Sequence, residues 1–84
     1  MAVRLVFLGR LEELAGTDGG TVDAPLGWAA LLAHLSEAFS PELAETVLGE
    51  RVKVALNGAL IADKGGIVLA DGDEIAFLPP VSGG

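Results

Sequence analysis

WAALLAHLSEAF, residues 28–39, carries the clearest periodic pattern in the chain. Its apolar residues recur at the spacing i, i+3, i+4, i+7 and i+11, which is typical of one side of an amphipathic helix. They are Trp28, Leu31, Leu32, Leu35 and Phe39. Such a helix is stable when its apolar side packs against another layer of secondary structure. A chain of 84 residues forms one domain, so the helix is expected to pack on a sheet formed by the rest of the chain.

Strand-like segments lie on both sides of this helix. Residues 3–8 (VRLVFL) are rich in β-forming side chains, and residues 52–56 alternate in the manner of a half-buried strand. Asn57-Gly58 is the strongest short signal for a hairpin, after which residues 59–61 return the chain. Residues 21–24 form a weaker strand, and residues 74–78 (EIAFL) form the last one. This order predicts an α+β fold: a mixed sheet with a helix packed on one face and the last strand inside the sheet.

Two further helical segments are expected. Ser40 is a typical N-cap, Pro41 suits the first helical position, and Gly49 ends the apolar pattern of residues 41–48. A shorter helix is indicated by the spacing of Leu11 and Leu14, and Gly16 would end it.

The composition excludes several classes of function. The formal net charge is −7, so no basic face for nucleic acid is expected. There is no cysteine and one histidine, His34, so neither a thiolate site nor a multi-histidine metal site is expected. MAVRLVFLGR lacks the pattern of a signal peptide, and no stretch has membrane-spanning length, which favours a cytoplasmic protein without a membrane partner. The hydrophobic content of 51% is high for a small acidic chain and predicts an apolar surface that faces a protein partner.

Other charged residues have simple interpretations. Asp71, Asp73 and Glu74 lack the spacing of a full loop of calcium ligands and instead indicate a turn. Arg51, Lys53 and Lys64 could contact an acidic patch on a partner or could serve only solubility.

The sequence FLPPVSGG, residues 77–84, divides the chain into a domain, residues 1–78, and an extended tail, residues 79–84. Pro79 and Pro80 cannot continue a central strand and favour a stiff, extended backbone. Gly83 and Gly84 have no side chains, so a narrow channel of a partner could close around them. A terminal carboxylate in that channel would have to be activated before it could react, for example as an acyl-adenylate. The chain has no phosphate-binding loop, so another protein would supply this activation and consume the ATP.

The chain resembles the small subunit of molybdopterin synthase, the family called MoaD. The resemblance rests on the terminal PPVSGG, the preceding DGDEIAF, the VALNG hairpin and the opening VRLVFLGRLEELAG, and it covers nearly the whole chain. It implies the ubiquitin-like β-grasp fold. It also implies a sulfur carrier whose C-terminal glycine is adenylated, converted to a thiocarboxylate and used to form the dithiolene of molybdopterin from cyclic pyranopterin monophosphate.

The same resemblance implies roles for particular residues. Gly84 would carry the sulfur, and the residues Pro79, Pro80, Val81, Ser82 and Gly83 would line the approach and contact the partner. Phe7, Leu60 and Phe77 are candidates for an apolar contact surface, and each is equally compatible with an ordinary place in the core. The chain would be a sulfur donor without its own catalytic centre and without a bound cofactor. Its partners would be a MoaE-like large subunit, which carries the catalytic residues, and a MoeB-like adenylyltransferase.

The sequence departs from the family at one place and leaves alternatives open. Where family members often have an arginine before a glutamate and a leucine, this chain has Glu12-Glu13-Leu14, so a salt bridge to the partner through that arginine is in doubt. One alternative keeps the carrier chemistry for another client, such as thiamin thiazole or thiolated RNA, or makes the chain a ubiquitin-like protein modifier. A third hypothesis is an acidic interaction module whose tail is incidental.

Overall fold

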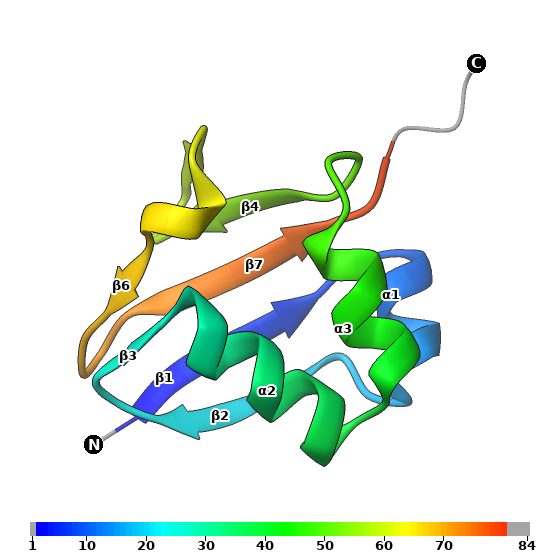
Figure 1. Ribbon diagram of the computed structural model, residues 1–84, viewed down its shortest axis with the longest axis horizontal. Coiled ribbons are helices and arrows are strands. Elements are labelled where there is room, and N and C mark those ends of the chain that lie inside the picture. Colours follow the sequence, from blue (N-terminus) through cyan, green and yellow to red (C-terminus); the bar gives the residue numbers. More distant parts are fainter. Residues whose placement is uncertain (1, 81–84) are drawn as a thin grey trace.

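The chain forms a mixed sheet with helices on one face (Figure 1). The computed structural model describes residues 2–80. In chain order the elements are β1 (Ala2–Phe7), α1 (Arg10–Ala15), β2 (Gly19–Asp23), β3 (Leu26–Gly27), α2 (Trp28–Ala38), α3 (Pro41–Leu48), β4 (Lys53–Leu56), β5 (Ala59–Ile61), the 3-10 turn η1 (Lys64–Gly66), β6 (Val68–Leu69) and β7 (Glu74–Leu78). Five strands form one sheet in the order β2-β1-β7-β4-β5, and β3 and β6 form a small second sheet. The predicted α+β class is confirmed.

The last strand lies in the middle of the large sheet, as predicted. β7 runs parallel to β1, with Phe77 opposite Phe7, and antiparallel to β4, with Phe77 opposite Val54. Figure 1 shows β7 in orange between β1 in blue and β4 in green. Because β7 has hydrogen-bonded neighbours on both sides, the backbone is held by the sheet up to Leu78.

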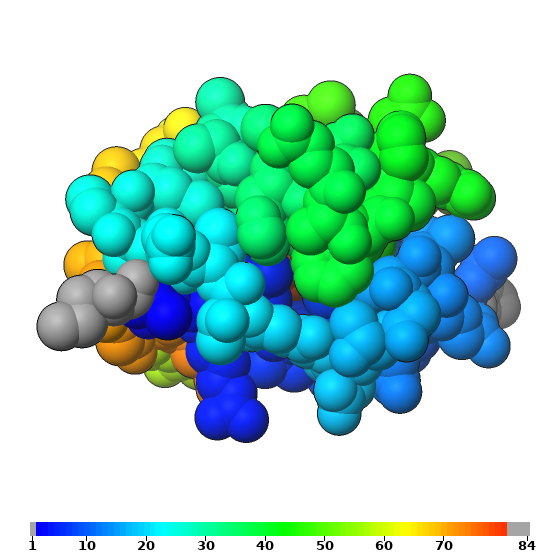
Figure 2. All heavy atoms as spheres, turned by 90° about the horizontal axis from the view of Figure 1, so that it is seen from below, coloured from blue at the N-terminus to red at the C-terminus, as the bar shows by residue number. Residues whose placement is uncertain are grey.

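The helices begin and end close to the predicted positions. Leu31 and Leu35 of α2 are fully buried, while Trp28 at its start packs partly against the core. Ser40 caps α3, since its Oγ accepts a hydrogen bond of 3.1 Å from the amide of Leu43. In the space-filling view, α2 and α3 form a continuous green surface above the blue and cyan residues of α1 and β2 (Figure 2).

The core lies between these helices and the sheet. Its sheet side consists of alternate residues of the strands, because successive side chains of a strand point to opposite faces. The buried apolar residues are Val3, Leu5, Phe7, Leu11, Leu31, Leu35, Leu43, Val47, Val52, Val54, Ile67, Leu69, Ile75 and Phe77. No charged or polar residue in the described part of the chain is buried.

The hairpin between β4 and β5 has the predicted turn. Asn57 and Gly58 both have positive φ angles, 51° and 87°, as the favoured two-residue hairpin turn requires. β5 is an edge strand, so Leu60 sits at the border of the sheet. Among the residues described, no helix combines the length and the apolar character needed to cross a membrane.

Candidate functional site

The candidate site is the end of the sheet where β7 stops and the tail begins. β7 ends at Leu78, and Pro79 and Pro80 follow it. Pro79 lies against Gly9, which links β1 to α1: a Cβ on Gly9 would stand 3.0 Å from Cγ of Pro79. The predicted site residues Val81, Ser82, Gly83 and Gly84 lie outside the described residues. Pro79 and Pro80 are the part of the predicted tail that the structure places.

Two hollows border these prolines. The first is lined by Pro79, Pro80 and residues of α1 and α3: Arg10, Leu11, Glu13, Leu14, Glu42 and Thr46. The second lies between Pro80 and the loop that joins α3 to β4, and its other lining residues are Thr46, Gly49, Glu50, Arg51 and Val52. Thr46 borders both hollows, so this part of α3 lies against the base of the tail.

The face of the sheet that is turned away from the helices is apolar near the tail. Val6 is opposite Ala76, Ala76 is opposite Ala55, and Ala55 is opposite Leu60, so one row of apolar residues crosses four strands. Leu60 is 69% exposed. Ala55 and Ala76, the two middle residues of this row, have small side chains, so they protrude less from the sheet than Val6 and Leu60 do.

A second row lies closer to the tail. The amide of Leu8 donates to the carbonyl of Phe77, which extends the ladder between β1 and β7 and brings Leu8 beside Leu78. Leu8 is 41% exposed and Leu78 is half-buried. On β4 this second row continues with the exposed Lys53, which is opposite Leu78. We call the apolar residues of the two rows the apolar half-face; they are Val6, Leu8, Ala55, Leu60, Ala76 and Leu78.

The prediction that Phe7 and Phe77 belong to a contact surface is wrong, because both rings belong to the core. They are 1% and 0% exposed, and they stack with their centroids 5.5 Å apart. Phe39 also packs edge-on against Phe7, at 5.1 Å. The residues that take the predicted place are their sequence neighbours Leu8 and Leu78, which point to the other face. Leu60 is exposed, as a contact residue has to be.

The sequence contained the signal for this correction. In residues 3–8 the face that includes Arg4 cannot be the core face, because a buried arginine without a partner is costly. Leu8 lies on the same face as Arg4, whereas Phe7 lies on the other.

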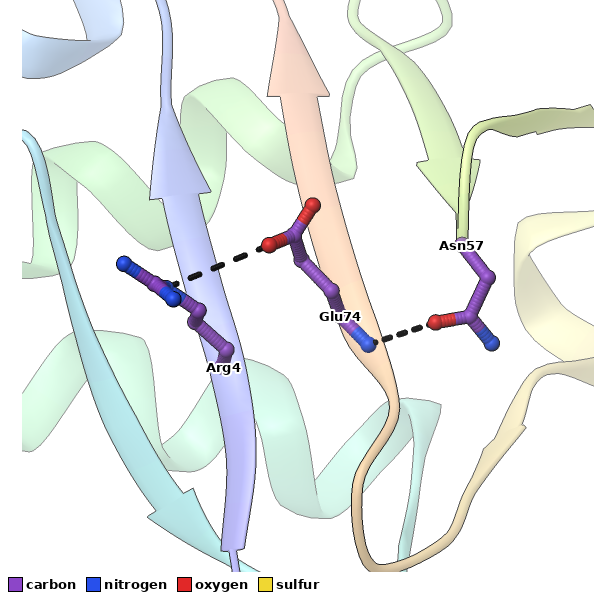
Figure 3. A network of polar contacts seen from close by, with 3 residues as sticks. All are labelled: Arg4, Asn57 and Glu74. Atoms are coloured by element: carbon purple, nitrogen blue, oxygen red, sulfur yellow. Dashed lines mark hydrogen bonds and ion pairs between the residues drawn. The ribbon is translucent and has the colours of Figure 1, made fainter.

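At the opposite end of the sheet, where β7 begins, polar side chains connect neighbouring turns and strands. The Asn57 side chain accepts a hydrogen bond of 2.9 Å from the amide of Glu74 and donates one of 3.0 Å to the Asp73 carboxylate. Asp73 also accepts a bond of 2.8 Å from the amide of Ala70. Figure 3 shows Asn57 and Arg4 on either side of Glu74; the ion pair from Arg4 is long, 3.9 Å, and exposed.

These contacts explain the acidic turn. The hydrogen bonds from the Ala70 amide and from Asn57 hold the pKa of Asp73 below its ordinary value. Through these bonds the Asp73 carboxylate connects the β4–β5 hairpin to the turn before β7. This agrees with the sequence-based interpretation of Asp71, Asp73 and Glu74 as a turn. In the part of the chain that the structure describes, no group of three or more histidine, cysteine, aspartate or glutamate residues is placed to hold a metal ion.

Comparisons with known proteins agree with this architecture. A model described as the ThiS family matches residues 5–84. The molybdopterin synthase sulfur carrier subunit of Escherichia coli K12 is 33% identical over 82 residues, which cover 98% of this chain and 99% of that protein.

Two solved structures are similar over the full length of both chains. SAMP1 from Haloferax volcanii superposes with a TM-score of 0.81 at 32% identity. A chain of the protein–protein complex of subunits 1 and 2 of the molybdopterin-converting factor from Helicobacter pylori superposes with a TM-score of 0.69 at 33% identity.

Proposed function

The chain belongs to the ThiS family, and from that premise we propose that it is the sulfur carrier subunit of a molybdopterin synthase. Its fold is the ubiquitin-like β-grasp that this family implies. The proposal is supported by relatives of similar length that bear this name in a bacterium and in two insects. It rests on sequence similarity that runs through the tail as well as through the domain.

The observation that carries the proposal is the position of β7. β7 is paired on both sides and leads directly to Pro79 and Pro80, and these prolines adjoin the apolar half-face, on which Leu8 and Leu60 are exposed. A partner that receives the tail can therefore bind the domain through the same end of the sheet. A firm base also reduces the conformational entropy that the tail loses on binding.

The chemistry takes place at the carboxylate of Gly84. One carboxylate oxygen attacks the α-phosphate of ATP and pyrophosphate leaves, which gives an acyl-adenylate. A hydrosulfide equivalent then adds to the acyl carbon, AMP leaves and a thiocarboxylate forms after loss of a proton. In the synthase this sulfur attacks a carbon of the pyranopterin precursor and displaces an oxygen substituent of that carbon, which leaves as water or as a freed phosphate oxygen. Water then hydrolyses the acyl–sulfur bond. The carboxylate is thereby regenerated and the sulfur stays on the pterin.

The partner for the apolar half-face is the large subunit of the synthase. The Helicobacter pylori structure is a complex of two subunits of the molybdopterin-converting factor, and one of its chains has this fold. Leu78 belongs to the half-face and directly precedes Pro79, so the surface is continuous with the tail. An exposed side chain such as Leu60 gains free energy when it leaves water at such a contact.

The activating partner is an adenylyltransferase of the MoeB type. It would bind the ATP and the carrier together, so the carrier itself would need no bound cofactor. A cytoplasmic location, which the sequence predicts, suits a reaction that consumes ATP.

The test is an intact-mass measurement after incubation with such an enzyme, ATP and sulfide. We expect one oxygen to be exchanged for one sulfur in the native chain and no exchange in a chain that lacks Gly84. The product should then convert the pyranopterin precursor when the large subunit is added. Failure with several enzymes that are active on other carriers would contradict the proposal.

A second candidate function is that of a protein modifier. The similarity to SAMP1 favours it, since a related structure from Methanosarcina acetivorans carries the full name small archaeal modifier protein 1. In that case the acyl-adenylate would react with a lysine amine of a target protein, and AMP would leave. Digested cell protein would then contain lysines that carry the C-terminal glycines of this chain, and their absence under conditions that yield the thiocarboxylate would exclude this candidate.

A further inference from the structure

Lys64 is not a free surface cation. Its ammonium group donates three hydrogen bonds to backbone carbonyl oxygens, those of Val47 at 2.9 Å, Gly49 at 2.6 Å and Val52 at 2.9 Å. An ammonium group has three donors, so all of them are used. It also lies 5.8 Å from the centre of the Trp28 ring. The sequence-based interpretation of Lys64 as a solvated or partner-facing charge is therefore wrong.

The three acceptors lie at the C-terminal end of α3 and in the loop after it, where the Gly49 carbonyl also accepts a bond of 3.4 Å from the Val52 amide. The last carbonyls of a helix have no partner within the helix. α3 has no basic residue in its last turn, and Gly49 after it is extended, with φ −64° and ψ 153°, so the left-handed turn that closes many helices is not formed. Lys64 reaches this helix end from η1 and supplies three further donors and a positive charge.

The same segment forms a wall at the base of the tail. Gly49, Glu50, Arg51 and Val52 line the hollow that Pro80 borders on its other side. The segment then enters β4, where Lys53 stands opposite Leu78, the last residue of β7. Lys64 thus bonds to the backbone of residues 47–52, and part of this segment lines the same hollow as Pro80.

The environment of the ammonium group agrees with a partly enclosed position. Burial lowers the pKa of Lys64 below its ordinary value, the charge of Lys53 adds to this effect, and Glu50 opposes it. The group is only half-buried, so solvent still reaches part of the side chain.

We propose that Lys64 is a positioning residue for the base of the tail: by fixing residues 47–52 it keeps in place the wall of the hollow that Pro80 borders. The inference rests on the proposed carrier function. A partner captures the tail best when its base is already in the bound direction, because less conformational freedom is lost. Without Lys64 the loop would move and capture would weaken, whereas the chemistry at Gly84 would not change.

The test compares the native chain with Lys64→Met in the thiocarboxylation reaction, with the carrier as the varied substrate. Lys64→Met keeps the length and apolar part of the side chain and removes the three donors. We expect KM for the carrier to rise about three- to tenfold while kcat is unchanged. Arg4→Met is the matched control, since it removes one positive charge from the end of the sheet away from Pro79, and its KM should equal that of the native chain.

The outcomes separate the inference from the proposed function. If the native chain is not thiocarboxylated, the carrier function fails. If it is, and folded Lys64→Met has the native KM, the positioning role is overturned; a lower kcat with an unchanged KM would overturn it as well. Should Lys64→Met not fold, Lys64→Gln carries the same prediction with a smaller rise in KM, because its amide can donate two of the three hydrogen bonds.

Discussion

Pro79 packs on Gly9 so closely that a Cβ at Gly9 would stand 3.0 Å from Cγ of the proline. Gly9 also has a φ of +54°, in the region that side chains disfavour. We predict that Gly9→Ala lowers the free energy of unfolding by about 1–3 kcal/mol through backbone strain. It should in addition displace Pro79 and lower the rate of thiocarboxylation of the folded protein. Urea unfolding and the intact-mass assay measure the two effects.

Gly16 offers the matched control for this prediction. It too has a positive φ, +77°, but among the described residues no atom from another part of the chain lies within 4 Å of the place that a Cβ would take. Gly16→Ala should therefore cost stability without changing the rate of thiocarboxylation. Equal rates for the two folded variants would show that the contact between Gly9 and Pro79 does not set the base of the tail.

The burial of Phe77 gives a second prediction. Its ring is fully buried and stacks on Phe7. Phe77→Ala should lower the free energy of unfolding by about 3–5 kcal/mol, because it removes apolar contacts and leaves a cavity. That is a large part of the total stability of a small domain, which is about 5–15 kcal/mol.

Chemical denaturation of Phe77→Ala and Leu78→Ala side by side measures the difference between the two faces of β7. Leu78 is half-buried, so Leu78→Ala should lower the free energy of unfolding clearly less than Phe77→Ala does. A larger loss at Leu78 would contradict the assignment of Phe77 to the core and of Leu78 to the open face.

Much of the fold could be predicted because its signals are local. The helix of residues 28–38, the Ser40 cap and the Asn57-Gly58 turn each depend on a few neighbouring residues, and each lies where the pattern places it. The position of β7 inside the sheet follows from strands at both ends of the chain, and it is confirmed as well.

The assignment of Phe7 to the contact surface could have been avoided. The segment of residues 3–8 is apolar on both faces except for Arg4, and Arg4 alone indicates that Leu8 lies on the open face and Phe7 in the core. Two other features depend on residues that are distant in sequence. The pairing of β3 with β6 joins two strands of two residues each, too short for a recognisable alternation. The hydrogen bonds of Lys64 to Val47, Gly49 and Val52 span at least 12 positions, and the residues next to Lys64 in the sequence do not indicate them.

The hydrogen bonds to Asp73 predict a dependence of stability on pH. Since its pKa is lower in the folded than in the unfolded chain, the carboxylate stabilises the fold at pH values above the ordinary aspartate pKa, about 3.9. This contribution should be lost as the pH falls below that value through the lower pKa of the folded state. Asp73→Asn should therefore be less stable than the native chain near neutral pH, and the difference should shrink in acid.

Urea unfolding of both chains at a series of pH values from neutral to strongly acidic tests this expectation. The difference between the two chains is the informative quantity, because other carboxylates change the stability of both. A difference that stays constant over the whole range would mean that ionisation of Asp73 does not couple to folding.

The exposure of Leu60 gives the sharpest test of the docking surface. Leu60→Asp places a charge in the apolar half-face and should hardly change stability, because 69% of the residue is in solvent. Its affinity for the large subunit should fall by about 10- to 100-fold, the effect of losing an apolar contact worth about 1.4–2.8 kcal/mol. Titration calorimetry with the isolated large subunit measures this change directly.

Val68→Asp is the control for Leu60→Asp. Val68 is 72% exposed, so the two substitutions introduce the same charge at equally accessible apolar positions. Val68 belongs to β6, which pairs with β3 in the small sheet and lies outside the half-face that adjoins Pro79. Native affinity for Val68→Asp together with weak binding for Leu60→Asp would place the partner on the half-face. Equal losses would instead indicate that the added negative charge acts at long range on an already acidic chain, and equal native affinities would exclude Leu60 from the contact.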